Sequence, residues 1–182
     1  MLTLSAGLSL NNTAVANALD LGDPISPYGS VHPRNKQEVA RRFLLAALGI
    51  IYRRDTQYRS PMYKAAAAEA GGTHLRVRVF FDEQSLSGGA LQLRPQACPL
   101  NVSNATECSW NEVQTDDGAW HNATTSLTPD AKGLYLDVEL PPTVRVNATR
   151  GTWSPWPVAH VYSQANGLPA LPWWAPVDQQ QA

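Results

Sequence analysis

The sequence predicts two kinds of structure in succession: a strand, a loop and a helix of α/β type, and then a mostly antiparallel β domain that forms a small sandwich. Three observations predict this order. A small-residue apolar segment leads through a Gly- and Pro-rich loop to an amphipathic segment within residues 13–52. From residue 74 the hydrophobic period changes to two. Polar, turn-like stretches then separate several short strand candidates.

The expected division of the chain follows from these changes in composition and hydrophobic period. Residues 1–56 form the α/β piece, residues 57–73 a connector and residues 74–165 the β-rich domain. Residues 166–182 form an extended tail rich in Pro and Trp.

Composition excludes several classes of protein. The chain has 182 residues, a hydrophobic fraction of 43% and a formal net charge of −1, which is typical of a globular protein. Its basic residues are dispersed, so no nucleic-acid partner is expected. The longest apolar run, Phe43–Tyr52, is shorter than the ~20 residues that span a bilayer, so no membrane partner is expected either.

The first three elements are expected in residues 13–52. Thr13–Leu21 has the apolar, small-residue texture of a buried strand in a parallel sheet. Gly22–Pro33 is a loop dense in Gly and Pro. A helix over Lys36–Tyr52 begins after Asn35, a suitable N-cap residue, with Glu38 in the capping-box position.

Helical spacing also predicts which face of this helix is buried. Arg41 and Arg42 are expected to point outward. The buried face is expected to hold seven apolar residues: Val39, Phe43, Ala47, Ile50, Leu44, Leu48 and Ile51.

The β-rich part follows an extended connector at Gln57–Tyr63 and an Ala-rich turn or short helix at Lys64–Gly72. His74–Asp82 and Gly133–Pro141 alternate apolar and polar residues and are the clearest strands. Shorter strand candidates are Ala90–Leu93, the residues around Val113, and Thr143–Val146.

The most informative chemical feature is His32, which sits in a His-Pro pair on the loop directly before the helix. A histidine in such a loop can act as a general base, because its ordinary pKa lies near neutrality. No convincing nucleophile follows it. Ser85 follows an alternating strand and precedes Gly88-Gly89 with no strand-to-helix turn after it, so we interpret it as part of a hairpin turn. The chain is therefore expected to be the C-terminal part of an enzyme.

Five Asn-X-Ser/Thr sequons favour N-glycosylation and passage through the secretory pathway, to a lysosomal or extracellular destination. They begin at Asn11, Asn101, Asn104, Asn122 and Asn147. Cys98 and Cys108 flank a short polar loop and form either a small disulfide or two free buried thiols. The first residues do not have the pattern of a signal peptide, which predicts that upstream sequence is missing.

Neither a metal nor a cofactor is expected. Cys98, Cys108 and His121 lack the spacing of zinc ligands. His74, His121 and His160 are expected to be ordinary surface or strand-end residues.

Two segments carry a resemblance to a known family. Asp20–Arg42, DLGDPISPYGSVHPRNKQEVARR, strongly resembles the C-terminal catalytic block of the sialate O-acetylesterases, of the SGNH-type hydrolase group. Thr152–Trp174, TWSPWPVAHVYSQANGLPALPWW, resembles the C-terminal signature of the same family. The two segments occur in the expected order, so the resemblance covers roughly residues 11–174.

The resemblance implies that residues 1–56 hold the last strand, the catalytic loop and the terminal helix of an SGNH-type sheet. It implies a serine esterase that removes O-acetyl groups from sialic acids or sialoglycoconjugates, without a cofactor, with His32 as the catalytic base. The serine and the oxyanion hole belong to an N-terminal hydrolase segment that this chain lacks, so the chain is expected to be inactive alone. Many such enzymes carry an Asp three residues before the His, where this chain has Gly29. Two alternatives follow: Asp23 orients the imidazole, or Asp23 only caps the loop and the enzyme works as a Ser-His dyad.

A rival interpretation assigns no catalysis to the β domain. Aromatic faces suit sugar stacking as well as core formation, so the domain is a carbohydrate-binding module or a purely structural one. Its tryptophans are Trp110, Trp120, Trp153, Trp156, Trp173 and Trp174.

Overall fold

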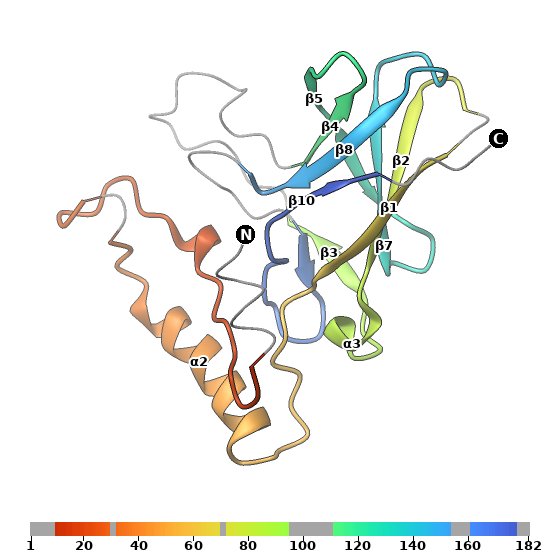
Figure 1. Ribbon diagram of the computed structural model, residues 1–182. Coiled ribbons are helices and arrows are strands. Elements are labelled where there is room, and N and C mark those ends of the chain that lie inside the picture. The colour runs from red at the N-terminus through yellow and green to blue at the C-terminus, as the bar shows by residue number, and fades with distance from the viewer. Residues whose placement is uncertain (1–9, 30–31, 70–71, 95–110, 154–160, 178–182) are drawn as a thin grey trace.

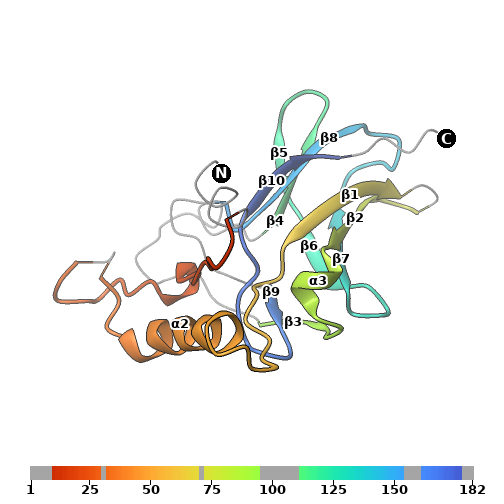
Figure 2. The ribbon, with the colours of Figure 1, turned by 60° about the horizontal axis from the view of Figure 1, so that its bottom comes forward.

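A computed structural model describes residues 10–29, 32–69, 72–94, 111–153 and 161–177. Within these residues the fold is mostly antiparallel β-structure with few helices. Figures 1 and 2 show two β-sheets packed against each other, with the N-terminal segment and its helix lying beside them rather than over either sheet. The predicted antiparallel β domain is thus confirmed.

The first sheet has the strand order β1-β2-β7-β6, with every neighbouring pair antiparallel. Its central strands are β2 (Leu75–Phe81) and β7 (Gly133–Val138), which pair in register from Leu75 with Val138 to Phe80 with Gly133. Its edges are β1 (Tyr63–Glu69) and β6 (Thr124–Leu127). In β2, buried and half-buried residues alternate along the whole strand, as its sequence period predicts.

The second sheet has the order β10-β8-β4-β5 and is also antiparallel. Its strands are β4 (Asn111–Thr115), β5 (Trp120–Asn122), β8 (Val146–Gly151) and β10 (Trp173–Pro176). A separate pair joins β3 (Leu91–Leu93) to β9 (Val161–Ser163).

The core lies between the two sheets and is centred on Trp173, of which 1% is exposed. Its indole stacks on Tyr63 of the first sheet at a centroid distance of 6.0 Å and meets Phe81 edge-on at 5.9 Å. Gly151 pairs with Trp173 across β8 and β10, and a Cβ at position 151 would overlap the indole. The lack of a side chain at Gly151 therefore gives Trp173 its place in the core.

The helices are η1 (Leu19–Leu21), α2 (Lys36–Ile50) and α3 (Glu83–Leu86). The predicted start of α2 is confirmed, since the side chain of Asn35 accepts a hydrogen bond from the backbone N–H of Glu38 at 3.2 Å. Among the described residues, every helix is too short or too polar to cross a bilayer.

The predicted strand at Thr13–Leu21 is wrong. Residues 13–18 have no regular structure, and Leu19–Leu21 form a 3-10 turn. A strand requires a hydrogen-bonded neighbour, and no described strand pairs with this segment. The SGNH-type sheet is accordingly not found in the described residues.

The predicted orientation of α2 is also wrong. Arg42 is the only residue of the helix that is buried, whereas Phe43 and Leu44 are 58% and 54% exposed. Ile51, just after the helix, is 72% exposed. Val39, Ala47, Leu48 and Ile50 of the predicted apolar face are only half-buried. Carboxylates, in contrast, enclose the guanidinium of Arg42.

The Ala-rich segment is a strand and not the expected turn or short helix, because pairing with β2 outweighs the helical propensity of alanine: Ala66 lies opposite Val79 and Ala68 opposite Val77. The described part of the tail, residues 166–177, includes β10, which pairs with β8. The domain boundaries at residues 56, 73 and 165 remain a prediction.

Candidate active site

His32 lies at the end of a series of backbone turns that leads into α2. Gly29 accepts from the backbone N–H of His32 at 2.9 Å, and the hydroxyl of Ser26 donates to the carbonyl of His32 at 2.7 Å. Gly29 has φ +95°, a conformation that favours glycine. These bonds hold the backbone of His32 while its side chain stays exposed.

The imidazole lines a shallow surface pocket with Tyr28, Pro33, Arg34 and Lys36. An exposed imidazole can accept a proton from a group that approaches from outside. No serine lines this pocket among the described residues, so the chain offers a base there without a nucleophile beside it.

Asp23 forms an ion pair with Arg34, whose Nε and Nη2 donate to the two carboxylate oxygens at 2.6 and 3.0 Å. The Arg34 guanidinium, through these hydrogen bonds, lowers the pKa of Asp23. Arg34 follows His32 by two residues, so the pair closes the loop across its base. This is the loop-stabilising role that the sequence left open; orientation of the imidazole by Asp23 stays a prediction.

Arg42 forms a buried ion-pair network that the sequence does not predict. Its guanidinium donates to the two oxygens of Asp20 at 2.7 and 2.8 Å and to Glu38 at 2.9 Å. It also donates to the carbonyl of Asn17. The side chains of Arg42 and Asp20 are 3% and 7% exposed. The network fixes the first two turns of α2, through Glu38 and Arg42, to Asp20 at the start of the loop that carries His32.

The same network extends to the β domain. The hydroxyl of Tyr162 donates to Asp20 at 3.1 Å, Arg41 donates to the carbonyl of Asn166 at 3.2 Å, and the amide of Asn17 donates to the carbonyl of Ala170 at 3.1 Å. The loop is thereby anchored to β9 and to the residues that follow it.

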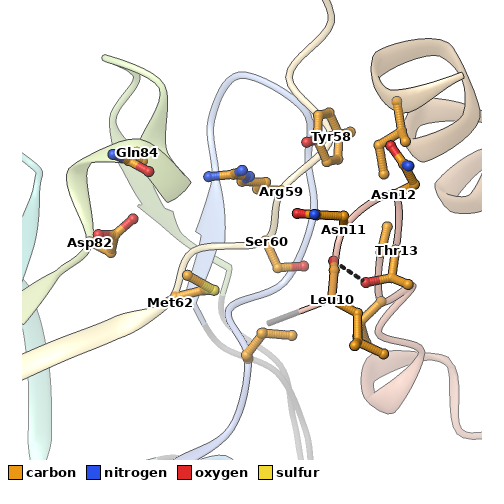
Figure 3. Close-up of a pocket in the computed structure, with 14 residues that line it drawn as sticks. Leu10, Asn11, Asn12, Thr13, Tyr58, Arg59, Ser60, Met62, Asp82 and Gln84 are labelled. Atoms are coloured by element: carbon orange, nitrogen blue, oxygen red, sulfur yellow. Dashed lines mark hydrogen bonds between the residues drawn. The ribbon is translucent and has the colours of Figure 1, made fainter. Parts of the chain in front are cut away.

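A second pocket, of about 560 Å³, lies between the N-terminal segment and the segments at Tyr58–Met62 and Asp82–Gln84 (Figure 3). Its lining is largely polar and includes the hydroxyl of Ser60, which is buried without a hydrogen-bond partner in the described structure. None of the described residues that line this pocket is a histidine. It therefore has hydrogen-bonding groups but lacks the base that acyl transfer needs.

Comparisons with known proteins point to one enzyme family. The chain is 27% identical to the sialate O-acetylesterase of Mus musculus over 177 residues, covering 93% of this chain and 29% of that protein. Its identity to the Homo sapiens protein of the same name is also 27%, over 174 residues. This chain is related to the sialate O-acetylesterases. It spans about 30% of the length of these curated relatives.

The structural comparison agrees with the sequence comparison. The crystal structure of a carbohydrate acetylesterase from Xanthomonas citri matches with a TM-score of 0.63 and 25% identity, over 86% of this chain and 31% of that one. No family model matches the chain.

In this relative of the sialate O-acetylesterases, Ser85 has a structural role. It is fully buried at the N-terminal turn of α3, and its hydroxyl donates to the carbonyl of Asp82 at 2.6 Å and accepts from the N–H of Met62 at 3.0 Å. A hydroxyl bound in this way is not available as a nucleophile. The expected hairpin turn at Ser85 is therefore wrong, because β2 leads directly into α3, which contains Ser85.

The remaining predicted residues are dispersed. His74 binds Asp137 at 3.1 Å and His121 contacts Thr115 at 3.2 Å. No cluster of potential metal ligands occurs in the ranges that the structure describes. The others either are exposed or fall outside those ranges: Asn11, Asn122 and Asn147 are exposed, and Cys98, Cys108, Asn101, Asn104 and His160 lie outside.

Proposed function

We propose that this chain supplies the general base of a sialate O-acetylesterase-like enzyme, which hydrolyses acetyl esters on sialic acids. The observation that carries the proposal is an exposed imidazole, His32, on a turn-stabilised loop in a chain related to these enzymes over 93% of its length. The Xanthomonas citri neighbour, a carbohydrate acetylesterase, supports the same class of substrate.

In this mechanism His32 takes the proton from a serine hydroxyl as the serine oxygen attacks the acetyl carbonyl. The imidazolium then returns the proton to the departing sugar hydroxyl. The imidazole next removes a proton from water, which attacks the acetyl-serine and releases acetate. Donors that stabilise the oxyanion, usually the largest electrostatic contribution, come from the same partner segment as the serine.

The exposed face of α2 supports a partner segment. Phe43 and Leu44 on the helix, and Ile51 and Tyr52 after it, are 58%, 54%, 72% and 66% exposed. Isolated exposed apolar residues are common, but a group of them on one element marks a contact surface. We propose that this face packs against the hydrolase segment that carries the serine.

The first test measures acetate release from O-acetylated sialic acid by the chain alone. No turnover is expected, because no serine lines the His32 pocket in the part of the chain that the structure describes. Turnover that is lost in a His32→Ala variant would contradict the proposal.

The second test uses a chimera in which this chain replaces the matching part of the Mus musculus enzyme. Acetate release is expected, with His32→Ala abolishing it. The control is His74→Ala, because His74 is a partly exposed histidine on the β domain. A chimera that unfolds cooperatively but has no activity, or that keeps its activity without His32, would contradict the assignment.

We further propose that the protein enters the secretory pathway and carries N-glycans. The exposure of Asn11, Asn122 and Asn147 supports this proposal. Expression in animal cells with an export signal should give a product whose mass falls on treatment with an N-glycosidase; an unchanged mass would contradict it.

A further inference from the structure

The outer face of the second sheet carries a row of aromatic and charged side chains. Trp174 of β10, Arg150 of β8 and Glu112 of β4 lie opposite one another in successive strands. Their neighbours in each strand, such as Trp173 and Val113, point into the core. We call Trp120, Trp153, Trp174, Arg150 and Glu112 the aromatic face.

Trp153 and Trp174 are exposed, although Trp173, next to Trp174 in the chain, is a core residue. Trp153 and Trp174 are 39% and 53% exposed, whereas Trp173 is 1% exposed. The rings of Trp153 and Trp174 lie 6.3 Å apart at an angle of 38°. They therefore form an open pair of indole surfaces at the edge of the sheet and not a closed stack within the fold.

A guanidinium lies beside this pair. Nε and Nη2 of Arg150 donate to the two oxygens of Glu112 at 2.5 and 3.0 Å, and the Arg150 guanidinium lies 4.0 Å from the centre of the Trp120 ring. These contacts fix the plane of the guanidinium. Its third nitrogen, Nη1, donates to no described residue, so the fixed group retains donors for a ligand.

A sugar matches this combination of groups. One side of a pyranose ring presents C–H groups that stack on an indole, and its hydroxyl edge accepts and donates hydrogen bonds. A purely apolar partner would bury the free donors of Arg150 without acceptors, which is unfavourable. We propose that the aromatic face binds a glycan, with a pyranose ring stacked on the Trp153–Trp174 pair and a hydroxyl or carboxylate accepting from Arg150.

This site shares no residue with the pocket at His32. It is a binding site on the β domain that needs no catalysis, and it does not depend on the proposed esterase function. Failure of either proposal therefore leaves the other unaffected.

The test uses the full chain made in bacteria, so that no N-glycan is attached to Asn122, which lies opposite Glu112 of the aromatic face. Lactose and α2,3-sialyllactose are titrated up to about 50 mM while the indole N–H resonances are followed by NMR, which detects a millimolar dissociation constant. The signals of Trp153 and Trp174, assigned with Trp→Phe variants, are expected to shift. The signal of Trp173 is expected to stay fixed, because that ring is in the core.

Variants locate the site. Trp174→Ala should weaken binding about tenfold, since one stacked ring contributes roughly 1.4 kcal/mol. Tyr135→Ala is the matched control, because Tyr135 is a partly exposed aromatic residue beside an arginine, Arg76, on the first sheet, and it should bind as the parent does. Absence of indole shifts with both glycans, or equal affinity in Trp174→Ala, would overturn the proposal.

Discussion

Replacement of Arg42 by methionine tests whether the loop that carries His32 is held by the buried ion-pair network. Methionine keeps an apolar stem but removes the guanidinium. Asp20, which is 7% exposed, would then be left as a buried carboxylate without its cation. Glu38 would keep its second partner, Arg41, at 2.7 Å.

The cost follows from the burial of Asp20. Removing one partner of a buried ion pair costs about 3–5 kcal/mol of unfolding free energy, because the remaining charge stays desolvated. Since small domains have unfolding free energies of only about 5–15 kcal/mol, Arg42→Met should lower the urea midpoint severely. The double variant Asp20→Asn/Arg42→Met removes the stranded charge, so it should recover part of the loss.

The molecule provides a matched control in Arg34→Met. Arg34 also binds an aspartate through two hydrogen bonds, but its side chain is 51% exposed, and solvent screens such pairs. Urea unfolding of all three variants is followed by tryptophan fluorescence. Equal losses in Arg42→Met and Arg34→Met, or no recovery in the double variant, would refute the reasoning.

Three further changes test other parts of the fold. The Arg41 guanidinium, by hydrogen bonding, lowers the pKa of Glu38 from 4.5 to about 2. The ionised Glu38 therefore stabilises the fold fully above pH 4.5, and this contribution is lost as the pH falls toward 2. Glu38→Gln should flatten this pH dependence of the unfolding free energy, measured by urea unfolding at several pH values. Gly151→Ala should lower the unfolding free energy by about 1–3 kcal/mol in urea titrations, because the added methyl group overlaps Trp173. Ser85→Ala should cost about 1–3 kcal/mol by leaving a buried N–H unpaired, seen as a lower Tm.

The sequence predicts well those elements whose pattern needs no knowledge of distant neighbours. Strand β2 alternates buried and half-buried residues as its period of two requires. Asn35 caps α2 because its carboxamide reaches the N–H three residues ahead within the same segment. In both cases local geometry determines the outcome.

Prediction fails where the outcome depends on a distant partner. The spacing of Phe43 shows that α2 has an apolar face, but not whether another element covers it, and Phe43 is 58% exposed. Arg42 looks like a surface residue because its acceptor Asp20 lies 22 positions away in the sequence. Alanine has a high helix propensity, but Ala66 pairs with Val79 and is therefore part of a strand.

The contacts between the two segments that resemble the esterase family explain why both are present. Asp20 and Arg41 belong to the first segment, and they bind Tyr162 and Asn166 of the second, at 3.1 and 3.2 Å. In the proposed mechanism the second segment therefore does not need to touch a substrate, since its hydrogen bonds hold the start of the loop that carries His32. The loop that carries His32 and the β domain are therefore held together by these hydrogen bonds. Tyr162→Phe, which removes the bond to Asp20, should make the loop more mobile without unfolding the sandwich. The expected result is faster amide hydrogen exchange at residues 20–34.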